Sequence, residues 1–247
     1  MEVHQPHHPT HKKKWTGYLL EFVMLFLAVF LGFMAENKRE HIVNGKKEKR
    51  YMQSMVEDLQ MDTALQNRII RRAEIVMRML DTTSHILLAG NFNDSLVKQL
   101  YRLNLPMLSS IQIFLTDRTS SQLKNAGGLN LIHNRAVVKA LFDYWTLAKD
   151  MENNAENYNQ LRLLTREKTY SVFNAKYYST ITGTNQFVEN SNPVLMTTDP
   201  FFLTELANRL NHLKNSNQFV YILNLKRELS RAVQLMELIR KEYHLKE

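Results

Sequence analysis

The apolar run at residues 15–35, WTGYLLEFVMLFLAVFLGFMA, constrains the fold of this chain more than any other feature. Glu21 is its one charged residue. A helix rises about 1.5 Å per residue, so the run covers about 30 Å, the thickness of a bilayer's hydrocarbon core. The sequence therefore predicts an uncleaved transmembrane helix over residues 15–36. A cleaved signal peptide and a buried core helix are the alternatives. Against a signal peptide, the run exceeds the usual apolar region of about 7–15 residues, and Phe33 disrupts the small-residue cleavage spacing.

Basic residues gather on both sides of this run and carry half of the net charge of +8. Residues 1–50 hold nine Lys and Arg against five Glu, and the rest of the chain has no basic stripe. Cations beside a span contact anionic lipid headgroups, at about 1 kcal/mol each. We therefore expect membrane lipids as partners and no binding of nucleic acid. The predicted lipid-contacting residues are Lys12, Lys13, Lys14, Lys38, Arg39, Lys46 and Lys47.

The charges give conflicting signals about orientation. Six basic residues follow the run closely and three precede it, which by the positive-inside rule places the large domain in the cytoplasm. Long domains, however, cross a membrane largely regardless of charge. A short basic tail followed directly by a span is typical of an anchor whose N-terminus stays cytoplasmic. We therefore expect a single-pass inner-membrane protein whose C-terminal domain lies outside that membrane.

Composition and periodicity together predict an all-α fold. The chain has 7 Gly, 5 Pro and 44% hydrophobic residues, which favours long regular elements. It has no cysteine, which excludes disulfides and thiol catalysis. Two sets of residues recur at steps of three and four, the spacing of one helix face, and polar Thr63 and Gln66 lie in the first set. The apolar members are Met52, Val56, Leu59, Ile70, Ala73, Met77 and Leu80, then Ile222, Leu225, Leu229, Ala232, Met236, Ile239 and Tyr243.

These patterns predict one N-terminal transmembrane helix followed by a long-helix bundle. The divisions are a disordered basic and His-rich tail at 1–14, the span at 15–36, a juxtamembrane helix at 37–90, and a helical bundle at 91–247 that packs with residues 50–90. Within the bundle, caps and breakers predict further boundaries. They give helices at 95–103 and 106–114 and one beginning near Arg118. A break at Ala126-Gly127-Gly128 forms a helical corner that leads into a long helix at 135–178, capped by Asn134. A loop at 179–200 and helices at 201–211 and 219–243 follow.

One face of the predicted span carries both its carboxylate and its small residues. Glu21, Leu25, Ala28, Gly32 and Ala35 follow each other at steps of four and three. Small residues let two membrane helices approach closely, and an intramembrane carboxylate usually faces protein or water. We therefore predict that this face packs against a second copy or another membrane protein. A side chain that extends to the headgroups, and a proton or ion role, are the alternatives for Glu21.

The remaining polar constellations predict no catalytic, cofactor or metal site. Asp58 and Asp62 share a helix face and can in principle bind a cation or act as acid and base, but no histidine lies at ligand spacing. We interpret the pair as structural, either solvated or bonded to arginines of the same helix: Arg68, Arg71 and Arg72. His133 is interpreted as bonded to backbone, and the tail histidines (His4, His7, His8 and His11) as opportunistic metal ligands. No known catalytic motif occurs, so we expect no enzyme.

Two segments carry a family resemblance. The first is GYLLEFVMLFLAVFLGFMAENKREH followed by KRYMQSMVEDLQMDT, and the second is SSQLKNAGGLNLIHNRAVVKALFDYW. They resemble an uncharacterised domain-of-unknown-function family of bacterial (Bacteroidota-type) single-span envelope proteins. The resemblance implies a bacterial origin and hence a periplasmic C-terminal domain, but no activity. This chain departs from the pattern in its glycine pair and in Trp145, where a tyrosine is expected. The matching positions are Glu21, Asp58, Leu59, Asp62, Leu123, Lys124, Gly127 or Gly128, Leu129, Leu131, Ile132, Asn134, Tyr144 and Trp145.

The function expected from these features is a membrane-anchored helical scaffold or interaction subunit of a bacterial envelope complex. It would assemble through its transmembrane and juxtamembrane helices. The alternative is a periplasmic helical-bundle domain that senses a ligand and acts through a partner, and a small-molecule enzyme is a third class. An apolar stripe left exposed along residues 50–80 or 219–243 favours the scaffold. An enclosed pocket lined by Tyr, Arg and Asn favours the sensor.

Overall fold

The structure, a computed structural model, describes residues 15–125, 127–178 and 192–245. These residues form helices and connections, and they contain no strand beyond one antiparallel bridge between Phe173 and Leu195. The predicted all-helical class is therefore confirmed for the described part of the chain. The tail at 1–14, with its lysines and histidines, lies outside the described residues, as does most of the predicted loop at 179–200.

The first helix, α1 (Trp15–Ala89), runs without interruption through Gly45. By their internal contacts the residues fall into two compact units, Met1–Arg50 and Tyr51–Glu247. In the first unit, α1 has an 18-residue window of mean hydropathy 2.3, none of it buried. This helix is long and apolar enough to cross a membrane. That criterion uses length and composition alone, and a signal sequence also meets it.

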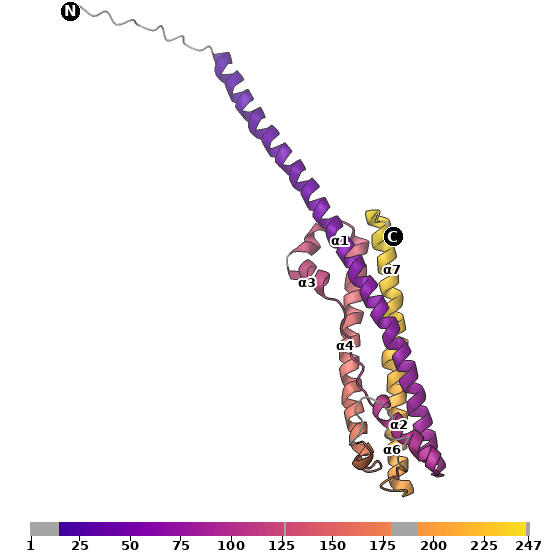
Figure 1. Ribbon diagram of the computed structural model, residues 1–247. Helices are drawn as coiled ribbons and strands as arrows, with labels where there is room; N and C mark the ends of the chain where they lie inside the picture. The colour runs from indigo at the N-terminus through magenta and orange to yellow at the C-terminus, as the bar shows by residue number, and fades with distance from the viewer. Residues whose placement is uncertain (1–14, 126, 179–191, 246–247) are drawn as a thin grey trace, which may run out of the picture. The chain divides into compact units, whose positions relative to one another are not determined.

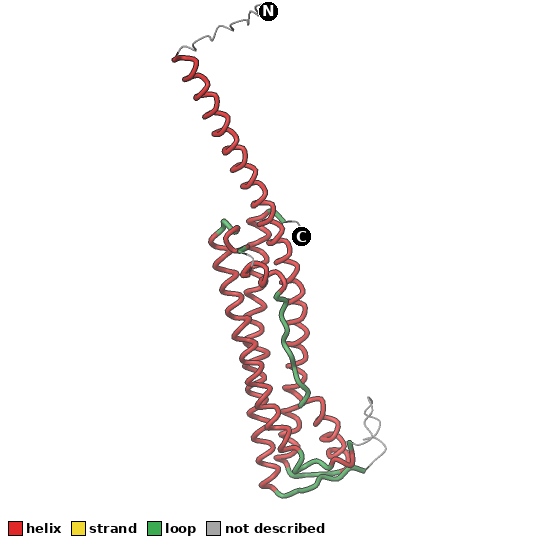
Figure 2. Tube along the Cα trace, turned by 90° about the vertical axis from the view of Figure 1, so that its left-hand side faces the viewer, coloured by secondary structure: helices red, strands yellow, loops and turns green. Residues whose placement is uncertain are grey.

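The second unit is built on three long helical segments. They are the part of α1 from Tyr51 onward, α4 (Arg135–Thr169), and a continuous run of α6 (Pro200–Asn217), the π-helical η3 (Gln218–Asn224) and α7 (Leu225–Tyr243). They lie side by side in Figures 1 and 2. The last run is antiparallel to α1, since Lys214 pairs with Asp81 and Lys226 with Glu74. Shorter elements close the ends: α2 (Asp94–Met107), α3 (Arg118–Asn125), η1 (Gly128–Leu131) and η2 (Ala175–Tyr177).

Two hydrophobic clusters fill this bundle, and a polar layer lies between them. Along α1, the first cluster ends at Leu59 and the second begins at Ile69. Buried Asp62 and Gln66 occupy the interval, and buried Glu228 occupies the matching interval of α7. We call these three residues the polar layer. Both apolar stripes predicted from sequence are largely covered inside the bundle.

Several boundaries differ from those predicted. The helix predicted at 106–114 is wrong, because residues 110–117 form an extended connection, seen in Figure 2 as the long loop along the helices. Ile111 and Ile113 of this connection are buried, and their neighbours Gln112 and Phe114 are exposed. Burial therefore repeats every two residues, as in an extended strand, rather than about every 3.6 residues as in a helix. The helices predicted at 201–211 and 219–243 are joined, because no glycine or proline separates them.

The predicted corner after α3 is confirmed. Gly127 has φ 68, a left-handed conformation that glycine adopts without steric cost. Asn134 then caps α4, because its side-chain oxygen accepts the backbone N–H groups of Ala136 and Val137. The helix ends at Thr169, short of the predicted residue 178.

Candidate functional site

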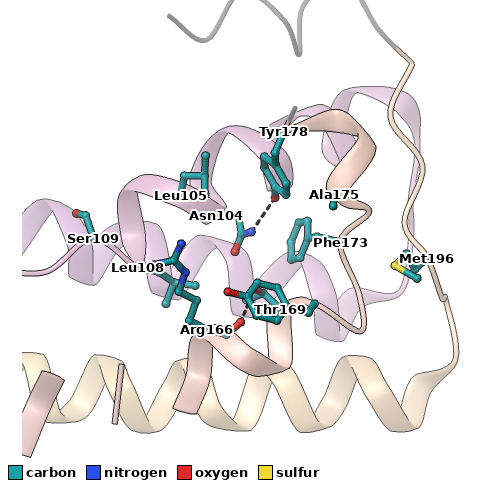
Figure 3. Close-up of a pocket in the computed structure, with 11 residues that line it drawn as sticks. Asn104, Leu105, Leu108, Ser109, Arg166, Thr169, Phe173, Ala175, Tyr178 and Met196 are labelled. Atoms are coloured by element: carbon teal, nitrogen blue, oxygen red, sulfur yellow. Dashed lines mark hydrogen bonds between the residues drawn. The ribbon is translucent and has the colours of Figure 1, made fainter. Parts of the chain in front are cut away.

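A pocket of about 520 Å³ opens between α2 and the C-terminal end of α4. Small-molecule sites span about 300–1,000 Å³ and are mostly apolar, with a few placed polar groups. Figure 3 shows the α2 side chains facing Arg166 of α4 and Phe173 of the following segment. Apolar side chains make up much of the wall, namely Leu105, Leu108, Phe173, Ala175 and Met196.

The fold of α2 turns one polar side chain into this pocket. Asn93 caps α2 by accepting the N–H of Leu96, and Leu100 and Tyr101 are buried in the core. Asn104 follows Leu100 by four residues and therefore lies on the same buried face. The hydroxyl of Tyr101 accepts the N–H of Asn174 and donates to the carbonyl of Val194, at 2.8 and 2.9 Å. These bonds hold the segments that flank the pocket against α2.

Asn104 and Tyr178 form the polar end of the pocket. Asn104 is 3% exposed, and its Nδ2 donates to the hydroxyl of Tyr178 at 2.7 Å. Its Oδ1 is buried and has no hydrogen-bond partner among the described residues. Burial raises the pKa of Tyr178, so this hydroxyl keeps its proton. A buried acceptor without a donor costs about 1–3 kcal/mol, and a ligand that carries a donor would remove this cost.

Two arginines lie one helical turn apart on α4, and the second of them lines the pocket. Arg166 lines it and is exposed. Arg162 is 9% exposed, and it donates to the carbonyl of Leu108 at 2.9 Å and to Oδ1 of Asn159 at 3.3 Å. Among the described residues, no carboxylate forms an ion pair with either guanidinium.

The acidic pair Asp58 and Asp62 forms a second polar centre, with a structural role. Asp62 accepts the N–H of Thr116 and the hydroxyl of Tyr144, each at 2.8 Å. Asp58 accepts from Arg118 at 2.6 Å and from the N–H of Thr119 at 2.9 Å, at the start of α3. The partners predicted for this pair, Arg68, Arg71 and Arg72, are wrong. The extended connection, the start of α3 and Tyr144 of α4 supply the bonds instead. Arg72 donates to Ser109 and to the carbonyl of Pro106.

Glu228 of the polar layer is buried without a hydrogen-bond partner. Its exposed fraction is 0%, and neither carboxylate oxygen has a partner among the described residues. Burial raises the pKa of Glu228 to about 8, and the nearby Asp62 and Glu152 add to the rise. Burial also raises the pKa of Asp62, against the opposing effect of its two donors. Glu228 is therefore mostly protonated at neutral pH.

The residues predicted to form the membrane packing face and the lipid-contacting set belong neither to the pocket nor to the polar centre around Asp58 and Asp62. On the predicted packing face, Glu21, Leu25, Ala28, Gly32 and Ala35 are exposed in their unit, and a Cβ added at Gly32 would meet nothing within 4 Å. The described lysines and arginine of the lipid-contacting set are also exposed, and Arg39 pairs with Glu36 at 2.6 Å. Lys12, Lys13 and Lys14 lie outside the described residues.

Sequence reasoning singled out the acidic pair but missed the pocket. The pocket's polar residues come from two segments, 104–109 and 166–178, which are more than fifty positions apart in the chain and share no motif. One feature of the sequence could have indicated the pocket. Asn104 is a polar residue on the apolar face of a short helix, four positions after Leu100.

Comparisons with family models, curated proteins and solved structures found no match for this chain. The resemblance to bacterial single-span envelope proteins therefore stays a prediction.

Proposed function

We propose that this chain is a membrane-anchored helical domain that binds a small, largely apolar molecule in the pocket between α2 and α4. One observation carries the proposal: a cavity of about 520 Å³ with apolar walls is lined by Asn104, whose buried Oδ1 has no partner among the residues that the structure describes. A ligand with a hydrogen-bond donor would satisfy that acceptor. A bound state would then be passed on through a partner, as in a ligand-sensing domain.

The two features chosen to separate scaffold from sensor both favour ligand binding. The stripe along residues 50–80 is buried, with Met52, Leu59 and Leu80 at 0% exposure. The stripe along residues 219–243 is likewise covered at Leu225 and Ile239. The helices that the scaffold hypothesis would leave open thus serve the bundle's own core, whereas the pocket has the expected Tyr, Arg and Asn in its wall.

Native mass spectrometry of the full chain tests the proposal. The protein is placed in nanodiscs of phosphatidylcholine and incubated with decanol or decanamide, two probes that each have an apolar chain and a hydrogen-bond donor. We expect a retained molecule for each chain. Ala175→Trp fills the pocket and should abolish retention, whereas Ala136→Trp, the same change at an exposed position of α4, should not.

A second pocket-filling variant controls for the case in which Ala175→Trp loses binding because it misfolds. Leu105 lines the pocket at 41% exposure, so Leu105→Trp adds bulk there without entering the core. Circular dichroism verifies that each variant keeps the parent's helix content. The proposal would be contradicted if the parent retained neither probe. It would also be contradicted if both filled variants retained the probes as well as the parent does.

For the membrane placement, we propose that residues 15–36 cross the inner membrane once, with the N-terminus cytoplasmic and the large domain periplasmic. Supporting it are the exposed apolar surface of this part of α1 and the flanking cations. The chain should stay in the membrane fraction in alkaline carbonate. A phosphatase fused after Glu247 should be active only if the domain is periplasmic, and a fusion active solely as a cytoplasmic reporter would reverse the orientation.

Assembly through the membrane helix is a second candidate function. The uncovered face that holds Glu21, Ala28 and Gly32 favours it, since a second backbone can approach closely there. Gly32→Leu should weaken association by holding the helices apart, while Glu21→Gln should largely preserve it because an amide still bonds between helices. Crosslinking of the full chain in detergent measures this. Normal assembly of Gly32→Leu, or a parent monomeric at every concentration with no associated membrane protein, would exclude it.

A further inference from the structure

We infer that the pocket selects an amphiphile with an anionic head, such as a carboxylate or phosphate on an apolar chain. This inference rests on the proposed binding function and specifies its ligand class. Its basis is positive charge without a counter-charge: Arg166 lines the pocket, Arg162 lies one helical turn before it on α4, and no carboxylate pairs with either among the described residues.

Among the described residues, the pocket wall carries a cation that has no paired anion, unlike two lysines of the same unit. Lys168, two residues after Arg166, pairs with Glu205 at 2.8 Å, and Lys214 pairs with Asp81 at 2.6 Å. The described residues that line the pocket include Arg166 and no Asp or Glu. An anion entering this pocket therefore meets an available guanidinium and no like charge.

A second, buried cation lies one helical turn before Arg166 on α4. Arg162 is 9% exposed and lies close enough to Tyr158 and Tyr221 to lower the pKa of each against the rise that their burial causes. A buried cation without a paired anion is unfavourable, and an anion bound nearby offsets that cost. Arg162 does not itself line the pocket, but it donates to the carbonyl of Leu108, a residue that does.

The hydrogen-bonding groups complete the polar end. Tyr178 accepts from Asn104, and its own hydroxyl hydrogen has no acceptor among the described residues. Tyr178 and Arg166 can both donate to an anionic oxygen, while Oδ1 of Asn104 accepts from a hydroxyl or amide of the ligand. The apolar chain then lies along Leu105, Phe173 and Met196. A guanidinium fits carboxylate and phosphate equally well, because it can donate two parallel bonds to either.

Competition among three probes of equal chain length tests the inference. Decanoate, decanol and decylammonium are titrated into the full chain in phosphatidylcholine nanodiscs, and native mass spectrometry gives each dissociation constant. Decanoate should bind at least about tenfold more tightly than decanol, the ratio typical of a charge-assisted bond, and decylammonium most weakly. Arg166→Gln should weaken decanoate binding more than decanol binding and so reduce that ratio, while Arg166→Lys should keep part of it. Arg135→Gln, which removes the same charge at the start of α4, should have no effect.

The outcomes separate this inference from the function on which it rests. If no probe binds, the proposed function fails. If decanol binds as tightly as decanoate, or Arg166→Gln weakens both alike, ligand binding stands and the anionic class is overturned. Repeating the measurement in phosphatidylglycerol nanodiscs identifies the source of the head group. A retained phospholipid that is lost in Arg166→Gln indicates membrane lipid, and retention of decanoate alone indicates a free acid; either result supports the inference.

Discussion

The buried carboxyl of Glu228 should make the domain less stable as pH rises. Its pKa is raised from 4.5 to about 8 in the folded state. Between these values the folded state keeps a proton that the unfolded state has released, so the free energy of unfolding falls with rising pH. The slope is about 1.4 kcal/mol per pH unit for one proton. From about pH 6 to about pH 9 the loss from this group is therefore about 2–3 kcal/mol.

Glu228→Gln removes this titration and keeps nearly the same shape. The free energy of unfolding of the variant minus that of the parent should rise by about 2–3 kcal/mol from about pH 6 to about pH 9. This change does not depend on how stable the variant is at about pH 6. Urea unfolding of the full chain in mild detergent, followed by circular dichroism, measures the difference. Asp62, whose pKa is also raised by burial, is present in both the parent and the variant, so its direct contribution cancels in the difference between them.

A matched control lies on the same helix. Glu237 is exposed, so Glu237→Gln should follow the parent's dependence on pH. The reasoning would be refuted if parent and Glu228→Gln lost the same free energy over this range. That result would mean that Glu228 is ionised at neutral pH in the folded protein, with a compensating partner that the described residues do not contain.

Three further substitutions probe the connections that hold the bundle, each measured by urea unfolding of the full chain. Tyr144→Phe removes the hydroxyl that donates to buried Asp62 and should cost about 1–3 kcal/mol. Asp58→Asn weakens the bonds to the start of α3 and should cost a similar amount, about 1–3 kcal/mol, whereas Glu57→Gln at the exposed neighbouring carboxylate should change stability by no more than about 0.5 kcal/mol. Asn134→Ala removes the cap of α4 and should cost about 1 kcal/mol. Unchanged unfolding midpoints would contradict the assigned bonds.

Sequence alone determined the local features of this protein. The helical class, the apolar N-terminal helix, the cap at Asn134 and the break at Gly127 each depend on residues within a few positions of each other. Spacing, capping and backbone preference act over that range, so the pattern is readable without a structure. The same local reasoning failed at residues 106–114, because bonds and burial from distant helices hold that connection extended.

Only the tertiary structure decided which polar groups meet. Asp58 and Asp62 were recognised as a pair, but their partners come from residues more than fifty positions away. The pocket likewise exists because the segment after α4 folds back against α2 and brings Tyr178 to Asn104. Glu228 lies on the buried face of α7. Its pKa is raised because the three long helices bury the carboxyl group completely. Burial and long-range contact are properties of the packed bundle, because they depend on side chains that sequence spacing does not relate.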